Sequence, residues 1–214
     1  MQIFWHGFSC VRIEAAHGDK EATLVTDPYS SDSGLRFPRT LAPEVVALSD
    51  QNQKKFPLDV FTNKPFVIAD PGEYEVSGIF SYAFAVPNEQ KKYPHGLMYR
   101  FEIEGMSIGF LGGLNRKLTE EETGVLENID ILLIPVGGGG ELNAKQAAEM
   151  IQVIEPRLVI PLNYQIDGVK EKLGSVDAFC KELGVKQRQD LNKLKISRKD
   201  LPADELVTVV LERA

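Results

Sequence analysis

Apolar and polar residues alternate along much of the first half of the chain, in short runs separated by turn residues. Val11-Arg12-Ile13 is one such run, and this period of two is typical of a strand with one buried face. The pattern predicts strands over Ile3–Trp5, Cys10–Glu14, Ala22–Thr26, Val45–Leu48, Phe66–Ala69, Glu73–Val86, Leu97–Glu104 and Ser107–Leu111.

The second half of the chain combines helical spacing with unbroken apolar runs. Asn143 suits the N-cap of a helix that reaches Ile154, because apolar residues between them repeat at helical spacing. Ile131–Pro135 and Leu158–Ile160 are short continuous apolar runs, typical of strands buried on both faces. The remaining expected elements are a helix over Thr119–Glu127 with a Thr119/Glu122 capping box, a helix over Ser175–Leu183 ended by Gly184, and a final strand over Leu206–Leu211.

Strands followed by a β-α-β-α order indicate two mixed sheets packed together with helices outside. The class is α+β, and a four-layer αββα sandwich fits the order. The 214 residues are 43% hydrophobic, enough for a sizeable core. Neither an internal repeat nor a long linker divides the chain, so we expect one domain over residues 1–214.

Composition narrows the class of function. The net charge of −7 disfavours binding of nucleic acid, because an acidic protein repels polyphosphate. No apolar run approaches the roughly 20 residues that span a bilayer, and the opening MQIFWHGFSC lacks a secretory pattern. We therefore expect a cytoplasmic protein without membrane contact. Cys10 and Cys180 are expected as unpaired thiols.

Seven segments in order carry a resemblance over nearly the whole chain. They are WHGFSCVRIE (5–14), LVTDPYS (24–30), VVALSD (45–50), PGEYEVSGIF (71–80), IGFLGGL (108–114), DILLIPVGG (130–138) and PRLVIPLNY (156–164). Together they resemble the metallo-β-lactamase superfamily, and within it the compact bacterial metal-dependent hydrolases similar to the ascorbate-phosphate lactonases. The resemblance implies the αββα metallo-β-lactamase fold in a single domain over residues 1–214.

The same resemblance implies a zinc site, which this sequence does not reproduce. Members with intact sites carry a Ser-His-x-His-x-Asp-His loop, a later histidine, an aspartate in Gly-Asp-Leu and a histidine in Pro-Met-His-Tyr. Those residue types suit Zn²⁺, which lowers the pKa of bound water to about 7. The corresponding positions of this chain hold, in order, Asp50, Asn52, Lys54, Lys55, Asn88, Gly113 and Asn163.

These replacements change the chemistry that the site supports. An amide is a poor zinc ligand, a protonated lysine cannot bind metal, and glycine has no side chain. Asp50 alone keeps a ligating group, suited at most to weakly bound Mg²⁺ or Ca²⁺. We therefore expect no zinc and no other cofactor. His6, His17 and His95 are too scattered to rebuild a zinc triad.

Four further residues or segments suggest specific roles. Lys54 or Lys55 is hypothesised to supply positive charge, paired with Asp50 or a bound anion, unless both lysines point into solvent. His6, in Trp5-His6-Gly7, either lines the pocket or is a hydrogen-bonded structural residue. Asp27 is expected to accept hydrogen bonds from backbone N–H groups rather than to catalyse. Gly137–Gly140 lacks the Gly-Lys-Ser/Thr ending of a P-loop and is expected to be a turn near the pocket mouth.

The sequence thus predicts a non-catalytic, zinc-less member of the superfamily with no catalytic residue. Its former active site would bind a small anionic ligand in a polar pocket lined by Asp50, Asn52, Lys54, Lys55, Asn88, Gly113, Asn163 and His6. One alternative is a hydrolase or lactonase that uses a non-zinc metal or no metal. Another is a structural subunit of a homo-oligomer, with exposed apolar residues around Phe37, Phe56 and Phe61.

Overall fold

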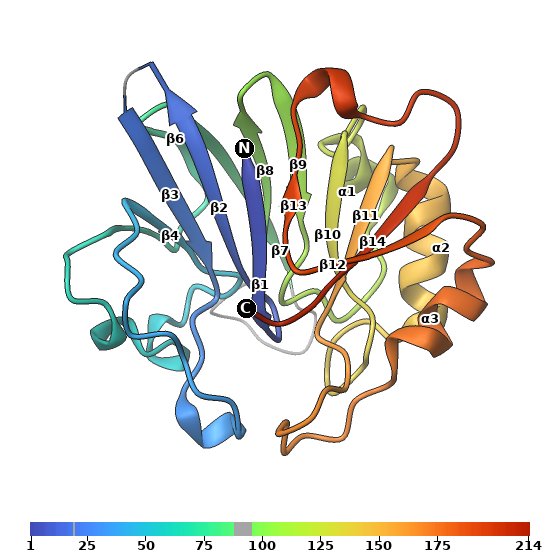
Figure 1. Ribbon diagram of the computed structural model, residues 1–214, viewed down its shortest axis with the longest axis horizontal. Helices are drawn as coiled ribbons and strands as arrows, with labels where there is room; N and C mark the ends of the chain where they lie inside the picture. The colour runs from blue at the N-terminus through green and yellow to red at the C-terminus, as the bar shows by residue number, and fades with distance from the viewer. Residues whose placement is uncertain (19, 88–95) are drawn as a thin grey trace.

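The computed structural model describes residues 1–18, 20–87 and 96–214, and their strands form two mixed sheets packed face to face (Figure 1). The first sheet has the order β13-β1-β2-β3-β4-β5. Its strands are β1 (Gln2–Gly7), β2 (Cys10–His17), β3 (Lys20–Thr26), β4 (Val45–Ala47), β5 (Phe66–Ile68) and β13 (Leu194–Lys195). The strands β3, β4 and β5 run parallel to one another.

The second sheet has the order β12-β14-β11-β10-β9-β8-β7-β6. Its strands β9, β10, β11, β14 and β12 are parallel, and β6 to β9 form antiparallel pairs. The bounds are β6 (Gly72–Val76), β7 (Ile79–Val86), β8 (Gly96–Ile103), β9 (Met106–Phe110), β10 (Ile131–Pro135), β11 (Leu158–Leu162), β12 (Arg188–Leu191) and β14 (Val207–Leu211). The expected α+β class with two mixed sheets is confirmed.

The α-helices in the described ranges all follow the first nine strands: α1 (Glu120–Gly124), α2 (Ala144–Ile154) and α3 (Val176–Leu183). Figure 1 shows α2 and α3 outside β11 and β14 of the second sheet. None of these helices combines the length and apolarity that crossing a bilayer requires. The helix expected over 119–127 is shorter than predicted, and the segment 73–86 divides into two strands at Ser77-Gly78, where φ is 53° and 80°.

Around Val25 and Val46 both faces of the first sheet are buried, and loops with 3₁₀ turns cover the outer face there. Leu24 and Val45 pack into the core between the sheets. Their neighbours Val25 and Val46 face outward and join a second cluster that contains Phe37 and Phe61. The cluster lies against the 3₁₀ turns at Ser31–Ser33, Gln53–Lys55 and Leu58–Val60.

This second cluster corrects the proposed apolar contact surface. Phe37 and Phe61 are each 6% exposed and pack edge to face, with ring centroids 5.7 Å apart. Phe56 is half-buried beside them. The three rings therefore cover a sheet of their own chain instead of offering an exposed patch. A homo-oligomer stays a prediction, without this surface to support it.

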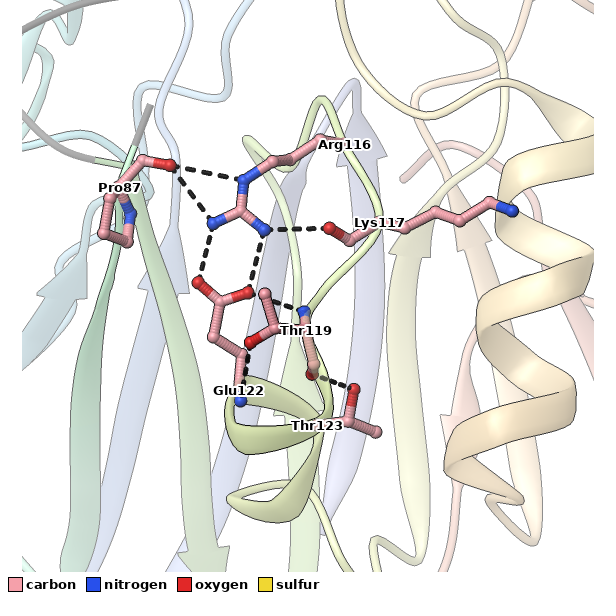
Figure 2. A network of polar contacts seen from close by, with 6 residues as sticks. All are labelled: Pro87, Arg116, Lys117, Thr119, Glu122 and Thr123. Carbon is pink, nitrogen blue, oxygen red and sulfur yellow. Dashed lines mark hydrogen bonds and ion pairs between the residues drawn. The ribbon is translucent and has the colours of Figure 1, made fainter. Parts of the chain in front are cut away.

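An arginine joins the start of α1 to the end of β7 (Figure 2). The Arg116 guanidinium donates two hydrogen bonds to the Glu122 carboxylate, at 2.8 and 2.6 Å, and others to the carbonyl of Pro87. Glu122 also accepts from the Thr119 backbone N–H, while the Thr119 hydroxyl accepts from Glu122 N, which completes the expected capping box. One carboxylate thus satisfies the helix start and the guanidinium together.

Replacing this carboxylate tests the network. Because Glu122→Ala removes one of the two hydrogen bonds of the capping box and a two-pronged ion pair, it should lower the free energy of unfolding by about 1–3 kcal/mol in urea titrations. Glu120→Ala is the matched control, since Glu120 is an exposed residue of the same helical turn. Equal effects of the two substitutions would contradict the structural role assigned to Glu122.

Candidate functional site

A cleft of about 460 Å³ opens between the two sheets. Its floor is built from residues that follow parallel strands: Asp27 after β3, Ser49 and Asp50 after β4, Gly113 after β9, and Asn163 after β11. Parallel strands end at a common edge, so segments far apart in the sequence deliver their side chains to one place. The loops after β3 and β11 meet below the sheets in Figure 1, where Lys170 N donates to Ser33 O at 3.1 Å.

Asp27 secures the loop that follows β4. Its Oδ1 accepts a hydrogen bond from the backbone N–H of Ser49 at 2.7 Å, which confirms the expected structural role. The carboxyl group is buried, and burial raises its pKa to about 7; the hydrogen bonds from Ser49 oppose this rise. Asp27 is therefore a positioning group for the backbone of Ser49 and for the loop that carries Asp50.

Glu141 is a cleft residue that the sequence analysis missed. Three successive glycines before it have positive φ angles of 76°, 67° and 94°, which only glycine adopts readily. At Gly137, a Cβ would lie 2.1 Å from the carbonyl oxygen of Asn163, so glycine also permits this close approach. The resulting turn lies at the cleft, as expected for Gly137–Gly140, and brings the Glu141 carboxyl group inward.

The Glu141 carboxyl group faces Asn163, one of the positions where the family carries a histidine. Asn163 Nδ2 donates to Glu141 Oε2 at 2.7 Å and lies 3.4 Å from the carbonyl oxygen of Gly138. Burial raises the pKa of Glu141 well above its usual range, and the charges of Asp27 and Glu171 act in the same direction. The amide thus serves as a hydrogen-bond donor to a buried carboxyl group.

The hypothesis of a lysine paired with Asp50 is confirmed for one of the two lysines. Lys55 Nζ forms an ion pair with Asp50 Oδ2, and the other oxygen accepts from Asn52 N at 2.8 Å. Asp50 and Lys55 both line the cleft. Lys54 is exposed and, like Asn52, lies outside the cleft lining. The short 3₁₀ turn Gln53–Lys55 explains the difference, because adjacent side chains on a turn point in different directions.

His6 does not line the cleft. In β1 the neighbouring Trp5 faces the core and stacks on Tyr164 with ring centroids 4.4 Å apart, so the alternation of a strand turns His6 to the opposite face. His6 is buried there, with Nδ1 3.5 Å from the carbonyl oxygen of Ala214. Burial, assisted by Arg12, lowers its pKa to about 4, so the ring is neutral at pH 7. Asn88 and His95 lie outside the described residues.

Aromatic and apolar side chains also line the cleft. Phe8, Tyr29 and Phe56 line it, together with Val86, Leu97 and Met98. Phe8 has a φ of 49°, an unusual conformation for a bulky residue, and Asp27 and Asn163 of the same cleft have φ angles of 36° and 50°. Strained backbone conformations gather at binding and catalytic sites.

The fold and this cleft are those of a β-lactamase-type domain, and comparisons identify the family. A model of the β-lactamase superfamily domain matches residues 2–163. The chain therefore belongs to the β-lactamase superfamily, and it has the metallo-β-lactamase fold.

Individual relatives agree with this assignment. A UPF0173 protein of Pyrococcus furiosus is 25% identical over 185 residues, covering 77% of this chain and 83% of that protein. A UPF0173 metal-dependent hydrolase of Thermoplasma acidophilum is 24% identical over 195 residues, with the same coverage. The crystal structure of a Thermotoga maritima protein, assigned by its name to the zinc-dependent hydrolases of the metallo-β-lactamase superfamily, superposes with a TM-score of 0.79. It is 25% identical and covers 99% of each chain.

The relatives correct the prediction about cofactors. The sequence led us to expect none, apart from weak binding of Mg²⁺ or Ca²⁺ through Asp50. The Thermoplasma acidophilum and Thermotoga maritima relatives carry metal or zinc dependence in their names. A metal cofactor thus belongs to this family, and the prediction of no cofactor is wrong.

The described side chains of this cleft nevertheless do not fit the histidine and aspartate zinc site that the family resemblance implies. In the described ranges, no three His, Cys, Asp or Glu side chains come together as a set of metal ligands. At the former ligand positions, Asp50 is paired with Lys55 and Asn163 directs its amide nitrogen at Glu141. At Gly113, a Cβ would lie 2.7 Å from Ser49 Oγ, so Ser49 fills the space that an aspartate side chain would need.

The tight contact at Gly113 gives a stability prediction. Gly113→Ala should lower the free energy of unfolding by about 1–3 kcal/mol, because the new methyl group must displace Ser49. Gly124→Ala is the matched control: its Cβ would meet nothing within 4 Å, and alanine favours the helix by about 0.5–1 kcal/mol. Denaturant titration measures the stability of both variants. An unchanged stability of Gly113→Ala would contradict the prediction, because it would show that Ser49 moves aside without cost.

The buried Asp27 carboxyl group predicts a dependence of stability on pH. Its pKa is about 7 in the folded protein against 3.8 as a model value, so the folded state binds more protons between these pH values. The free energy of unfolding should therefore fall as pH rises from 4 to 7, with Asp27 accounting for on the order of 2–4 kcal/mol.

Urea titrations at successive pH values in the presence of a chelator measure this slope. Asp27→Asn should reduce it, because an amide keeps the acceptor for Ser49 N but does not titrate. Glu141 contributes with the same sign, so part of the slope should remain. A slope identical in the variant and the native chain would rule out Asp27 as its source.

Proposed function

We propose that this chain is a binding member of the β-lactamase superfamily, whose cleft holds a small polar ligand without hydrolysing it. One observation carries the proposal: Asp50 and Asn163, which stand at two of the family's ligand positions, are each bound to another side chain of the described cleft. Asp50 pairs with Lys55, and Asn163 donates to Glu141. Hydrolysis requires a group that activates water, and these contacts occupy both side chains.

The form of the cleft supports a ligand-binding role. Its volume of about 460 Å³ lies within the range of small-molecule sites, which combine apolar walls with a few polar groups. The strained backbone at Phe8, Asp27 and Asn163 fixes these groups before a ligand arrives.

A metal-dependent hydrolase is the second candidate, favoured by the names of the relatives. The two candidates predict different results in an assay with lactone, phosphodiester and β-lactam model substrates, each with added Zn²⁺, Mn²⁺ or Mg²⁺. A binding protein should show the same residual rate as the double variant Asp50→Ala, Asn163→Ala, which lacks both cleft groups.

The same preparations should be screened for ligand binding by thermal unfolding. A ligand at about 100 times its Kd stabilises by about 2.7 kcal/mol, which corresponds to a rise in Tm of roughly 5–10 °C for a chain of this size. We expect such a rise for the native chain and its loss in the double variant. Metal-stimulated turnover that the double variant lacks would favour the hydrolase instead.

Three expectations from the sequence stay predictions: a cytoplasmic location, the lack of nucleic-acid binding, and assembly into a homo-oligomer. The acidic net charge of −7 supports the second. Light scattering of the purified chain measures the third.

A further inference from the structure

We infer that Tyr99, a core residue outside the cleft lining, is a positioning residue that sets where Ser49 and Asp50 lie on the cleft floor. The inference rests on the proposed binding function, because it takes these two residues as part of the binding site. Tyr99 belongs to β8 of the second sheet, and its side chain is fully buried in the core between the sheets. Ser49 and Asp50 follow β4 of the first sheet. One side chain thus joins the two sheets beside the site.

The Tyr99 hydroxyl group reaches two backbone carbonyls of the first sheet. It donates to Leu48 O at 2.6 Å and lies 3.0 Å from Ile68 O. Ile68 O also accepts from Leu48 N at 3.0 Å, so Leu48 O, at the shorter distance, is the acceptor that depends more on the hydroxyl. Burial raises the pKa of Tyr99 above its usual value, so the group keeps its proton at neutral pH. Since a buried carbonyl that loses its donor is destabilising, the hydroxyl fixes the chain directly after β4.

The next two residues along the chain are held by the same strand of the second sheet. Leu97 N donates to Ser49 O at 2.8 Å. Asp50 forms an isolated antiparallel bridge with Gly96. Consecutive positions of β8 therefore contact consecutive positions of the loop that carries the floor residues.

Asp27 holds the same loop from within the first sheet. Its Oδ1 accepts from Ser49 N at 2.7 Å, and Asp27 itself follows β3, the strand beside β4. A shift of the floor relative to the second sheet would leave this bond intact, but it would break the bonds from Tyr99 and Leu97. The position of the floor relative to the cleft lining at Leu97 and Met98 thus depends on β8.

The packing of the Tyr99 ring allows the hydroxyl to be removed by itself. The ring stacks on Phe101 with centroids 5.3 Å apart and lies 6.1 Å from the ring of Phe110. Tyr99→Phe keeps both contacts and deletes the hydrogen bond. Tyr164→Phe is the matched control, because its buried hydroxyl donates to Leu211 O at 2.9 Å. That carbonyl belongs to β14, which β11, β10 and β9 separate from β8.

Hydrogen exchange of the Leu97 amide in the unliganded protein, followed by NMR, tests the inference. This amide joins β8 to the carbonyl of Ser49. In Tyr99→Phe it should exchange about tenfold or more faster, after correction for the change at the core amides of β10, which report global stability. The backbone chemical shifts of Ser49 and Asp50 should change as well. In Tyr164→Phe the corrected exchange rate and these shifts should match those of the native chain.

The hydroxyl proton of Tyr99 gives a second measurement, made on the native chain alone. A proton held in a buried hydrogen bond exchanges slowly with water. It should therefore give its own NMR signal, with nuclear Overhauser contacts to the Tyr99 ring and to Leu48. This measurement decides the question if Tyr99→Phe does not fold.

The outcomes distinguish this inference from the proposed function. Equal corrected exchange of the Leu97 amide in Tyr99→Phe and the native chain would overturn the inference. A Tyr99 hydroxyl proton that exchanges freely with water would also overturn it. Neither measurement uses a ligand or a substrate. Metal-stimulated hydrolysis in the separate activity assay would overturn the proposed function, and Tyr99 would then position the floor of a hydrolase site.

Discussion

The carbonyl oxygen of Phe8 accepts hydrogen bonds from both sheets. Trp5 Nε1 donates to it at 2.8 Å and closes the turn between β1 and β2, while the backbone N–H of Asn163 donates at 3.0 Å from the end of β11. A buried carbonyl without partners is costly, so the two donors fix how the turn and the strand end meet. Phe8 and Asn163 accept left-handed conformations there. This junction therefore holds Phe8 and Asn163, which both line the cleft, next to each other.

The cleft lies at the position of the family's active site, but different side chains line it. The hydrogen bond from Asn163 to Glu141 gives a partner to a polar group that would otherwise be buried without one, whereas the Asp50–Lys55 ion pair is partly exposed. The fold is therefore preserved while the chemistry of the site changes, because the strand ends that carry the side chains are set by the core and not by the ligands. The names of two relatives assign metal or zinc dependence to those proteins, whereas Asp50 and Asn163 of this cleft are paired with other side chains.

Patterns local in sequence predicted most of the fold, including the buried runs of β10 and β11 and the capped helix α2. They missed β12, because Arg188–Leu191 is a polar edge strand without an alternating apolar face. Four residues named from the alignment of the loops line the cleft: Asp50, Lys55, Gly113 and Asn163. Glu141 was missed, because its direction is set by three left-handed glycines and by contact with Asn163, neither of which a periodicity reveals. His6 was named as a possible pocket residue, but strand alternation places it on the other face of β1.

A crystal structure of the protein grown with Zn²⁺ at pH 7 tests the central claim most directly. The claim predicts that Lys55 stays paired with Asp50 and that Asn163 keeps its hydrogen bond to Glu141. Zinc coordinated by Asp50, with Lys55 turned away, would contradict it.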